Sequence, residues 1–285
     1  MIPGQARVDK ATVAGVVVLY HSPPSCIEHI QTYLPQIDKL YIVDNTPEGV
    51  GWADAFAART SNVVYVGLGA NKGIAHALNA GATKAIADGY TYLLTMDDDS
   101  RAPENMIETM ARFWNMHLND PIGIVCPQHA LTTATSTAKP TETAPRTVLT
   151  TMTSGNLISL PVYQQVGGFD DELFIDVVDH DYTLKLAVHG YTVIELSTLQ
   201  LVHRLGQQRA VLGGLLRYVT HRPVRNYYLI RNSILVGLRH RKQHPAYLIE
   251  ALRTVLIEVV KISLFENQKR VRLRYAWQAL RDGLR

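Results

Sequence analysis

The sequence predicts an α/β fold in which a mainly parallel sheet is flanked by helices, as in a Rossmann-like domain. Three observations support this prediction. Apolar, β-branched runs alternate with helical patterns from residue 13 to residue 196, as they do in βαβ units. The runs contain little polar alternation, which is typical of strands buried on both faces. Several runs end in polar residues, and an open α/β sheet collects its ligands at the carboxyl ends of its strands.

The first half of the chain contains four of these strands. We expect strands at residues 13–20, 39–43, 62–66 and 93–96, with helices at residues 25–34 and 75–86. Turn-forming residues at 21–24 and 44–47 end the first two strands. The order of strands and helices predicts parallel neighbours.

The second half continues the alternation after a long connection. We expect a helix at residues 103–117, a strand at 122–126, a short strand near 156, a helix at 174–186 and a strand at 191–196. Residues 131–151 are rich in Thr, Ala and Pro without periodicity, so we expect a surface loop there. That loop either folds over a substrate or is a plain connection. Asp176 is expected in the first turn of its helix as a partner of the helix dipole.

Composition and charge limit the class of protein. At 285 residues, with 47% hydrophobic and 19% charged residues, the chain is able to fold around a sizeable core. The net charge of +3 gives no general case for nucleic acid binding. Cys26 and Cys126 stand alone, which fits a reducing compartment such as the cytoplasm. The apolar run at residues 13–20 is too short for a signal sequence or a membrane span.

Three consecutive aspartates, Asp97, Asp98 and Asp99, follow the strand at residues 93–96. Their mutual repulsion is most easily offset by a divalent cation. In an extended segment Asp97 and Asp99 point to one side and Asp98 to the other, which leaves Asp98 for a sugar hydroxyl. The alternative is a solvated acidic turn that caps the next helix, since the residues after it also resemble a helix start.

Two other strand ends suit a nucleotide. Asp44, at the end of the second strand, is placed to contact a base or ribose, or else it forms an Asx turn. The third strand leads through a glycine-containing loop, residues 67–73, to a helix N-terminus, where a phosphate or diphosphate is favoured. The loop has the spacing G-x-G-x-x-x-G and no Gly-Lys-Ser/Thr, which argues against a dehydrogenase and an ATPase.

The polar motifs occur in a recognisable order along residues 13–240. They are Tyr20-His21, Val43-Asp44-Asn45, Asn71-Lys72-Gly73, Met96-Asp97-Asp98-Asp99, Ser154-Gly155-Asn156, Gly167-Gly168-Phe169-Asp170, Asp179-His180-Asp181 and His203. In this order the chain resembles family 2 glycosyltransferases of the GT-A fold. Residues 174–179 and 223–232 are most similar to bacterial rhamnosyltransferases, while galactofuranosyltransferases share much of the pattern.

The resemblance implies a role for each motif. Tyr20, His21, Asp44 and Asn45 would line the nucleoside pocket, Asn71, Lys72 and Gly73 would approach the nucleotide, and Ser154 and Gly155 would belong to the same nucleotide-sugar site. Asp97 and Asp98 would bind ribose or sugar hydroxyls. Asp99 and His203, with Asp97, would hold Mn²⁺ or Mg²⁺ against the diphosphate. So few protein ligands predict a metal that binds tightly only with the donor present.

Asp179 would be the general base, with Asp181 as a supporting acid. A base without a second acid predicts direct displacement and inversion at C1. The implied enzyme is a metal-dependent glycosyltransferase that moves L-rhamnose from dTDP-rhamnose onto a cell-surface polysaccharide or lipid-linked glycan. The alternatives are a galactofuranosyl- or hexosyltransferase that uses a UDP-sugar, and a non-catalytic nucleotide-sugar-binding scaffold. A nucleotidyltransferase is disfavoured, because residues 20–24 replace its basic glycine-rich loop.

We expect residues 1–240 to form the glycosyltransferase domain and residues 241–285 a basic helical extension. Residues 246–265 are apolar, and their charged residues lie within an arc of roughly 140° on a helix. These residues are Glu250, Arg253, Glu258 and Lys261. The pattern is that of an amphipathic helix.

Residues 269–285 contain six basic residues and one acidic residue, with aromatic residues between them. Cation-rich amphipathic helices suit an anionic membrane surface. We therefore expect a peripheral position on the inner face of the cytoplasmic membrane, where a lipid-linked acceptor would lie. The alternatives are an ordinary packed helix pair and a homodimer contact.

Overall fold

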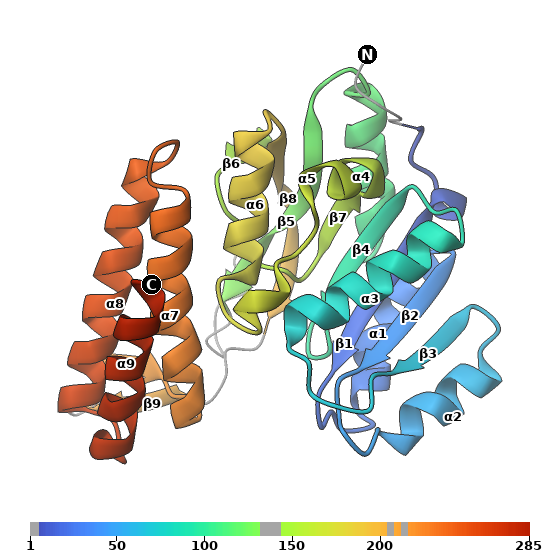
Figure 1. Cartoon of the computed structure of the whole chain (residues 1–285). Helices are drawn as coiled ribbons and strands as arrows, with labels where there is room; N and C mark the ends of the chain where they lie inside the picture. Colours follow the sequence, from blue (N-terminus) through green and yellow to red (C-terminus); the bar gives the residue numbers. More distant parts are fainter. Residues whose placement is uncertain (1–5, 132–143, 204–207, 212–215) are drawn as a thin grey trace. The chain divides into compact units, whose positions relative to one another are not determined.

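The computed structural model describes residues 6–131, 144–203, 208–211 and 216–285, and Figure 1 labels its helices and strands. The strands are β1 (Val13–Leu19), β2 (Lys39–Asp44), β3 (Val63–Gly67), β4 (Tyr92–Asp97), β5 (Ile122–Leu131), β6 (Arg146–Val148), β7 (Asn156–Ser159), β8 (Thr192–His203), β9 (Gln208–Val211) and β10 (Leu216–Val219). The helices are α1 (Cys26–Tyr33), α2 (Gly51–Arg59), α3 (Ile74–Ala87), α4 (Met106–Met116), α5 (Leu160–Val166), α6 (Val178–Val188), α7 (Pro223–Arg239), α8 (Pro245–Leu264) and α9 (Lys269–Gly283).

Eight strands form one sheet in the order β3-β2-β1-β4-β7-β5-β8-β6. β1 pairs in parallel with β2 and β4, β2 with β3, and β5 with β8. β7 is antiparallel to β4 and β5, and β6 is antiparallel to β8. The sheet is therefore mainly parallel, which confirms the predicted fold class. β9 and β10 form a separate antiparallel pair.

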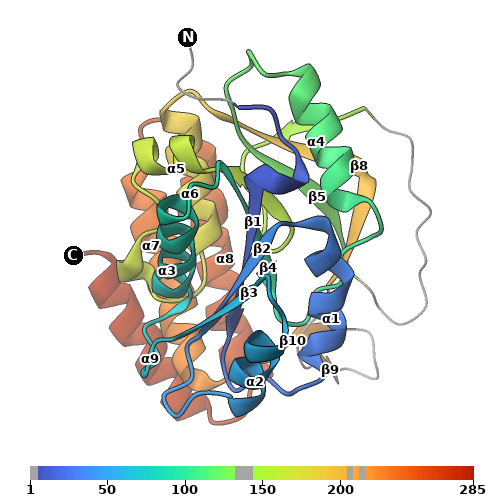
Figure 2. The ribbon, with the colours of Figure 1, turned by 90° about the vertical axis from the view of Figure 1, so that its right-hand side faces the viewer.

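The central strands are buried because helices cover both faces of the sheet. Figure 2 shows α3 on one side of β1, β2 and β4, with α1 and α4 on the other. α3 approaches β1 closely at Gly81, where a Cβ atom would lie 2.3 Å from Cγ2 of Val16. On the opposite face β1 shares the main core with Ile30 of α1 and Trp114 of α4, both fully buried. Apolar burial of this kind stabilises the sheet by roughly 25 cal/mol per Å².

The observed elements differ from the predicted ones in two places. Helix α6 begins at Val178 rather than at residue 174, because Phe174, Asp176 and Val177 have left-handed backbone conformations, with φ of 61°, 64° and 66°. The prediction that Asp176 lies in the first helical turn is therefore wrong. The expected loop at residues 131–151 contains β6, which pairs with β8. Its residues 132–143, and with them the question of closure over a substrate, lie outside the described part.

The chain divides into two compact units. The first unit, Met1–Asp171 with Tyr182–Arg204, contains the large sheet. The second unit, Glu172–Asp181 with Leu205–Arg285, contains α7, α8 and α9. Its core consists of Ile230, Ile234, Val255, Ile262, Ala276 and Ala279. The expected extension at residues 241–285 thus lies in one unit with α7, and its status as a separate part of the chain stays a prediction.

Helix α8 has the predicted length, but its charged arc is only partly exposed: the side chains of Glu250 and Arg253 are 64% and 69% exposed, whereas those of Glu258 and Lys261 are largely buried. Glu258 and Lys261 lie 2.6 Å apart with side chains only 7% and 15% exposed. Asn226 of α7 donates to Glu258 at 2.5 Å, so the buried half of the arc has its partners inside the unit. The exposed side carries large apolar residues, namely Ile249, Leu252, Leu256, Ile257, Val260 and Leu264. Within the described ranges no helix combines the length and apolar composition needed to cross a membrane.

Candidate active site

Three parallel strands end side by side at one edge of the sheet. Leu19 of β1 pairs with Asp44 of β2, and Val18 pairs with Asp97 of β4. This register brings the predicted motifs at Tyr20, Asp44 and Asp97 next to one another at the carboxyl ends of the strands, where α/β sheets bind ligands. We call this group of strand ends the strand edge.

The three aspartates form a turn at the end of β4. The N–H of Ser100 donates to the carbonyl of Asp97 at 3.3 Å. Asp98 and Asp99 are turn residues, so the expected extended alternation of side chains is wrong. The helix-cap alternative is wrong too, since α4 begins only at Met106. All three aspartates are half-buried beside the strand ends.

Asp98 is held by residues near the start of α1. The hydroxyl of Ser22 donates to Oδ2 of Asp98, and Nδ1 of His29 bonds the Asp98 carbonyl at 2.8 Å. Burial raises the pKa of the Asp98 carboxyl, and the charge of Asp99 acts in the same direction, while the Ser22 hydrogen bond opposes them. Burial and the same two aspartates raise the pKa of Cys26 to about 11, so its thiol stays protonated at neutral pH. A cation or a hydroxyl donor near Asp98 would favour its charged form.

The turn offers oxygen ligands that fit Mg²⁺ or Mn²⁺. In the part of the chain that the structure describes, no group of three His, Cys, Asp or Glu side chains is arranged to hold a metal ion. His203 ends β8, where its backbone pairs with Leu131, and its side chain lies outside the described residues. Asp97, Asp98 and Asp99 are oxygen donors that the described part of the strand edge offers to such a cation.

Asp44 forms the Asx turn that was the alternative to a nucleoside contact. Its carboxylate is fully buried and accepts from the N–H of Thr46 at 3.0 Å, the N–H of Val50 at 2.6 Å and the hydroxyl of Tyr65 at 2.8 Å. Burial, followed by the bond to Asp44, raises the pKa of Tyr65 to about 12, so the phenol remains a donor. A direct contact with a nucleoside would require this buried carboxylate to become accessible.

Asn45 links the end of β2 to the loop before α3. Its Oδ1 accepts from the N–H of Lys72 at 2.8 Å, and its Nδ2 donates to Oδ1 of Asn71 at 3.1 Å. The same Asn71 oxygen accepts from the N–H of Gly73 at 3.1 Å. Gly73 is the N-cap of α3 with φ of 87°, a conformation that favours glycine. This network leaves the Lys72 side chain exposed at a helix N-terminus, where an anion is favoured.

Tyr20 and His21 form an aromatic pair at the end of β1. Their ring centroids are 4.4 Å apart, and Tyr20 is 44% exposed. His21 has a left-handed backbone, φ 52°, and its N–H donates to Oγ1 of Thr46 at 2.9 Å. Nδ1 of His21 lies 3.3 Å from Glu48. Exposed rings held by backbone contacts suit stacking on a flat base.

Ser154 and Gly155 reach the strand edge because β7 is antiparallel to β4. Oγ of Ser154 accepts from the N–H of Asp97 at 3.0 Å, and the N–H of Gly155 donates to the Thr95 carbonyl at 2.7 Å. Nε2 of His129 lies 2.7 Å from the Ser154 carbonyl. Ser154 is fully buried, so its contacts support the end of β4.

Several supporting residues of the strand edge were not predicted. Ser22, Thr46 and His29 each bond a motif residue, as described above. Ser22 lies three residues after the end of β1 and Thr46 two residues after the end of β2, and this position was the one signal for them in the sequence. No local pattern marks His29 as a partner of Asp98, because the two are 69 residues apart.

Asp179 belongs to the second unit and is half-buried in the first turn of α6. Its Oδ1 accepts from the N–H of His180 at 2.9 Å. Nδ1 of His180 lies 3.1 Å from the hydroxyl of Tyr247 on α8. Asp181 is fully buried, and its Oδ1 is 2.8 Å from Arg239 and 3.1 Å from His240. Asp181 therefore has a structural role, whereas the side chain of Asp179 is partly exposed.

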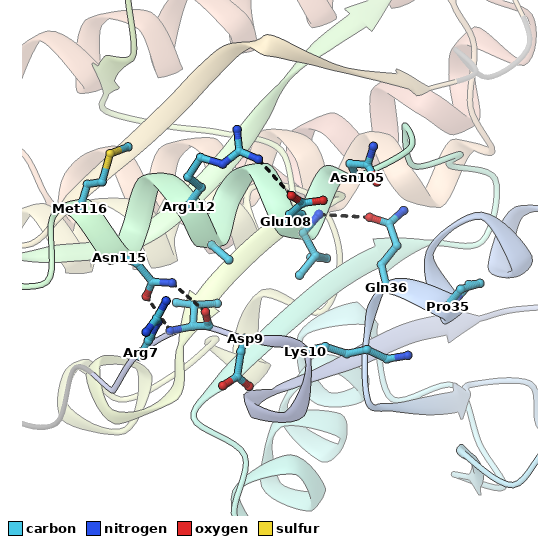
Figure 3. Close-up of a pocket in the computed structure, with 13 residues that line it drawn as sticks. Arg7, Asp9, Lys10, Pro35, Gln36, Asn105, Glu108, Arg112, Asn115 and Met116 are labelled. Carbon is cyan, nitrogen blue, oxygen red and sulfur yellow. Dashed lines mark hydrogen bonds and ion pairs between the residues drawn. The ribbon is translucent and has the colours of Figure 1, made fainter.

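A pocket of about 650 Å³ lies beside α4 in the first unit (Figure 3). Asn115 exchanges two hydrogen bonds with the Val8 backbone, both of 2.8 Å, and Gln36 accepts from the N–H of Ile107 at 3.1 Å. None of the described residues expected to bind a nucleotide sugar lines this pocket. It is separate from the strand edge.

Comparisons with known proteins agree with this geometry. Residues 20–152 match the family model described as Glycosyl transferase family 2. The chain is 25% identical over 290 residues to the dTDP-rhamnosyl transferase RfbF of Shigella flexneri, a match that covers 96% of each chain.

Two solved structures share the fold. TarS 1–349 of S. aureus in complex with UDP-GlcNAc has a TM-score of 0.66 and 13% identity, with 96% of this chain and 80% of that chain covered. GalNAc-T7 with UDP, GalNAc and Mn²⁺ has a TM-score of 0.56 and 12% identity, with 68% of this chain and 44% of that chain covered. At such identities these matches establish the fold alone.

Proposed function

We propose that this chain, a family 2 glycosyltransferase of the GT-A fold, transfers L-rhamnose from dTDP-rhamnose to a bacterial cell-surface polysaccharide or lipid-linked glycan. The observation that carries the choice of donor is the likeness to a dTDP-rhamnosyl transferase over 96% of both chains. A galactofuranosyl- or hexosyltransferase that uses a UDP-sugar is the alternative within the class.

The strand edge supplies a group for each part of such a donor. The exposed rings of Tyr20 and His21 suit the base. Lys72 and the backbone N–H groups at the start of α3 offer positive charge to the diphosphate. Asp98 accepts hydrogen bonds from hydroxyl groups of the ribose or the sugar. Asp44, whose oxygens are already bonded, supports the loop after β2.

A divalent cation, Mn²⁺ or Mg²⁺, would be held by Asp97 and Asp99 together with His203. Bound there, it would neutralise the charge that develops on the departing diphosphate. The imidazole favours Mn²⁺ over Mg²⁺, which prefers oxygen ligands. Phosphate oxygens and water would fill the other coordination positions.

Asp179 takes the proton of the acceptor hydroxyl as the new C1–O bond forms and the bond from C1 to the diphosphate oxygen breaks. A nucleoside diphosphate leaves without protonation by a second acid, so a single carboxylate is sufficient. Direct displacement by the acceptor inverts the configuration at C1.

Release of dTDP from dTDP-rhamnose, with a lipid-linked glycan extract as acceptor, tests this mechanism. We expect Asp179→Asn to lower turnover by about 10²–10⁴-fold while the donor still binds, because the substitution removes only the base. Asp120→Asn, at an exposed ion pair with His117, is the matched control. Removal of divalent cations with a chelator should also abolish turnover. Full activity of Asp179→Asn, or full activity in chelator, would refute the mechanism.

A panel of nucleotide sugars tests the donor. The correct donor should raise the melting temperature with Mn²⁺ present, since a ligand at 100 times its Kd stabilises the folded state by about 2.7 kcal/mol. We expect dTDP-rhamnose to do so and UDP-galactose and UDP-galactofuranose to have little effect. Stabilisation by a UDP-sugar would select the alternative donor class. Stabilisation without turnover of any donor would identify a binding scaffold.

We also propose that α8 and α9 bind an anionic membrane surface, where a lipid-linked acceptor would be presented. The apolar residues of the outer side of α8 are between 45% and 69% exposed. Exposed cations accompany them, namely Arg253, Lys269, Arg270 and Arg274. Each basic residue near anionic lipid contributes about 1 kcal/mol. The same surface would otherwise be the contact of a homodimer.

Cosedimentation with phosphatidylglycerol vesicles separates these two partners. We expect binding that weakens at high salt and is lost in the double variant Ile249→Gln/Leu256→Gln. Met116→Gln, an equally exposed apolar residue on α4, is the control. A dimer seen by light scattering without lipid, and broken by the same double variant, would point to a second copy instead.

A further inference from the structure

The segment that leads into α6 has an unfavourable backbone. Phe174, Asp176 and Val177 all have positive φ, between 61° and 66°. Side chains other than glycine rarely adopt this conformation, and a β-branched residue such as Val177 is a genuine outlier. A segment of this kind persists only where its surroundings hold it, and such strain clusters at functional sites. The partners that hold residues 172–177 therefore indicate what the segment is for.

Asn232 of α7 is the central partner. It is fully buried, and its Nδ2 donates to the carbonyls of Leu173 at 2.7 Å, Ile175 at 2.8 Å and Asp176 at 3.1 Å. Its Oδ1 accepts from Arg231 at 2.9 Å. One side-chain amide thus binds three carbonyls of residues 173–176, which stabilises the left-handed backbone of this segment.

Arginines on α7 bind two carboxylates on either side of Asp179, one within this segment and one after it. Arg225 binds the Asp176 carboxylate with Nε and Nη2, at 3.0 Å and 2.8 Å from Oδ1. Arg239 lies 2.8 Å from Asp181. The contact of Arg225 through two nitrogen atoms fixes the orientation of the Asp176 carboxylate as well as its distance. Asp179 lies between the two anchored carboxylates.

The three partners share one side of α7. Arg225, Asn232 and Arg239 are separated by seven residues each, close to two helical turns of 3.6 residues. They form a polar row that faces residues 172–181, and we call it the α7 row. All of these residues belong to the second unit.

We infer that the α7 row positions Asp179, so that Arg225 and Asn232 are positioning residues for the transfer reaction. This inference rests on the proposed role of Asp179 as general base. A base must lie within hydrogen-bond reach of the proton it removes, and a misplacement of about 1 Å costs on the order of 10²-fold in rate. His180 adds a lateral contact to Tyr247, which limits movement of the same turn.

The α7 row also offers a matched control. Asn226 lies on the same helix and is buried to a similar degree, but it bonds Glu258 and Arg272 rather than residues 172–181. Loss of Asn226 therefore disturbs the unit without touching the segment that carries Asp179.

The experiment compares Asn232→Leu, Arg225→Met, Arg225→Lys and Asn226→Leu in the dTDP-release assay, well below the melting temperature of each variant. We expect Asn232→Leu and Arg225→Met to lower kcat by about 10- to 100-fold with donor KM changed less than about twofold. Arg225→Lys should recover part of the loss, because it keeps the charge but not the two-point contact. Asn226→Leu should lower the melting temperature and leave kcat within about twofold, as expected of a residue that does not contact the segment.

Loss of kcat in Asn226→Leu equal to that in Asn232→Leu would overturn the inference, and so would a loss confined to donor KM. If Asn232→Leu does not fold, the test rests on Arg225→Met, a substitution at a half-exposed residue. An unchanged kcat in Arg225→Met overturns the inference. Asp179→Asn is run beside them. An active Asp179→Asn means that the proposed function has failed, whereas an inactive Asp179→Asn with active α7 variants means that only the positioning role has failed.

Discussion

Replacement of Gly155 by alanine separates two physical costs at the strand edge. Gly155 has φ of 82°, and a Cβ atom there would lie 2.8 Å from Cγ of Pro127 and 3.1 Å from Cδ2 of Leu201. The left-handed conformation costs an alanine about 1–2 kcal/mol. The overlap with rigid neighbours adds about 1–3 kcal/mol. Together we expect Gly155→Ala to lower the free energy of unfolding by about 2–5 kcal/mol.

Two other glycines supply the controls. Gly190 has φ of 81° with nothing within 4 Å of its added Cβ, so Gly190→Ala should show the conformational cost alone, about 1–2 kcal/mol. Gly81 in α3 has a helical backbone, and its added Cβ would lie 2.3 Å from Val16, so Gly81→Ala should show overlap partly offset by about 1 kcal/mol of helix propensity.

Thermal unfolding measures all three variants. A change of 1 kcal/mol shifts the melting temperature by roughly 2–4 °C for a domain of this size. Gly155→Ala should therefore shift it by roughly twice as much as Gly190→Ala or more. We also expect weaker donor binding, because Ser154 supports the end of β4 through the Asp97 N–H. Equal shifts in Gly155→Ala and Gly190→Ala would refute the overlap argument.

Three further predictions concern buried polar groups. The pKa of Asp98 is raised in the folded state, so its contribution to stability is full below its unfolded pKa and is lost as pH rises through its folded pKa. In urea titrations, Asp98→Asn should therefore gain stability relative to the wild type from pH 4 to pH 7. An equal difference in stability at both pH values would contradict this. Tyr65→Phe removes a donor to the buried Asp44 and should cost about 1–3 kcal/mol by thermal unfolding; an unchanged free energy of unfolding would contradict this. Lys261→Met leaves Glu258 buried without its cation and should lower the free energy of unfolding by about 3–5 kcal/mol. The double variant Glu258→Leu/Lys261→Met should be much closer to the wild type in stability. Equal losses of stability in the two variants would mean that the pair itself is stabilising.

The strands and the strand edge were predictable because their signals are local. A continuous β-branched run such as residues 13–20 forms a buried strand whatever follows it, and β1 is observed there. Parallel strands separated by helices end at the same edge of a sheet, so Asp44 and Asp97 were expected at one edge, although β4 pairs with β1 rather than with β3. The family motifs rest on the same order of residues.

The partners of several polar side chains were decided by the tertiary structure. Asp44 forms the Asx turn with Thr46 that its local sequence allowed, but its carboxylate also accepts from Tyr65 of the next strand. Asp176 lies outside α6 because Asn232 and Arg225 stabilise a backbone that local propensity disfavours. The local sequence pattern does not reveal the stabilisation that these long-range contacts provide.

Helix α8 shows the same division between sequence and structure. Its sequence determined a helix with a charged arc and an apolar remainder, since both follow from a period of 3.6 residues. Only the tertiary structure decided which side faces water. Asn226 and Lys261 compensate the burial of Glu258, so this half of the charged arc lies inside the unit, while Glu250 and Arg253 stay exposed beside large apolar residues. The period of 3.6 residues shows which residues of a helix share a side. The hydrogen-bond partners on neighbouring helices decide which of its charged residues can be buried.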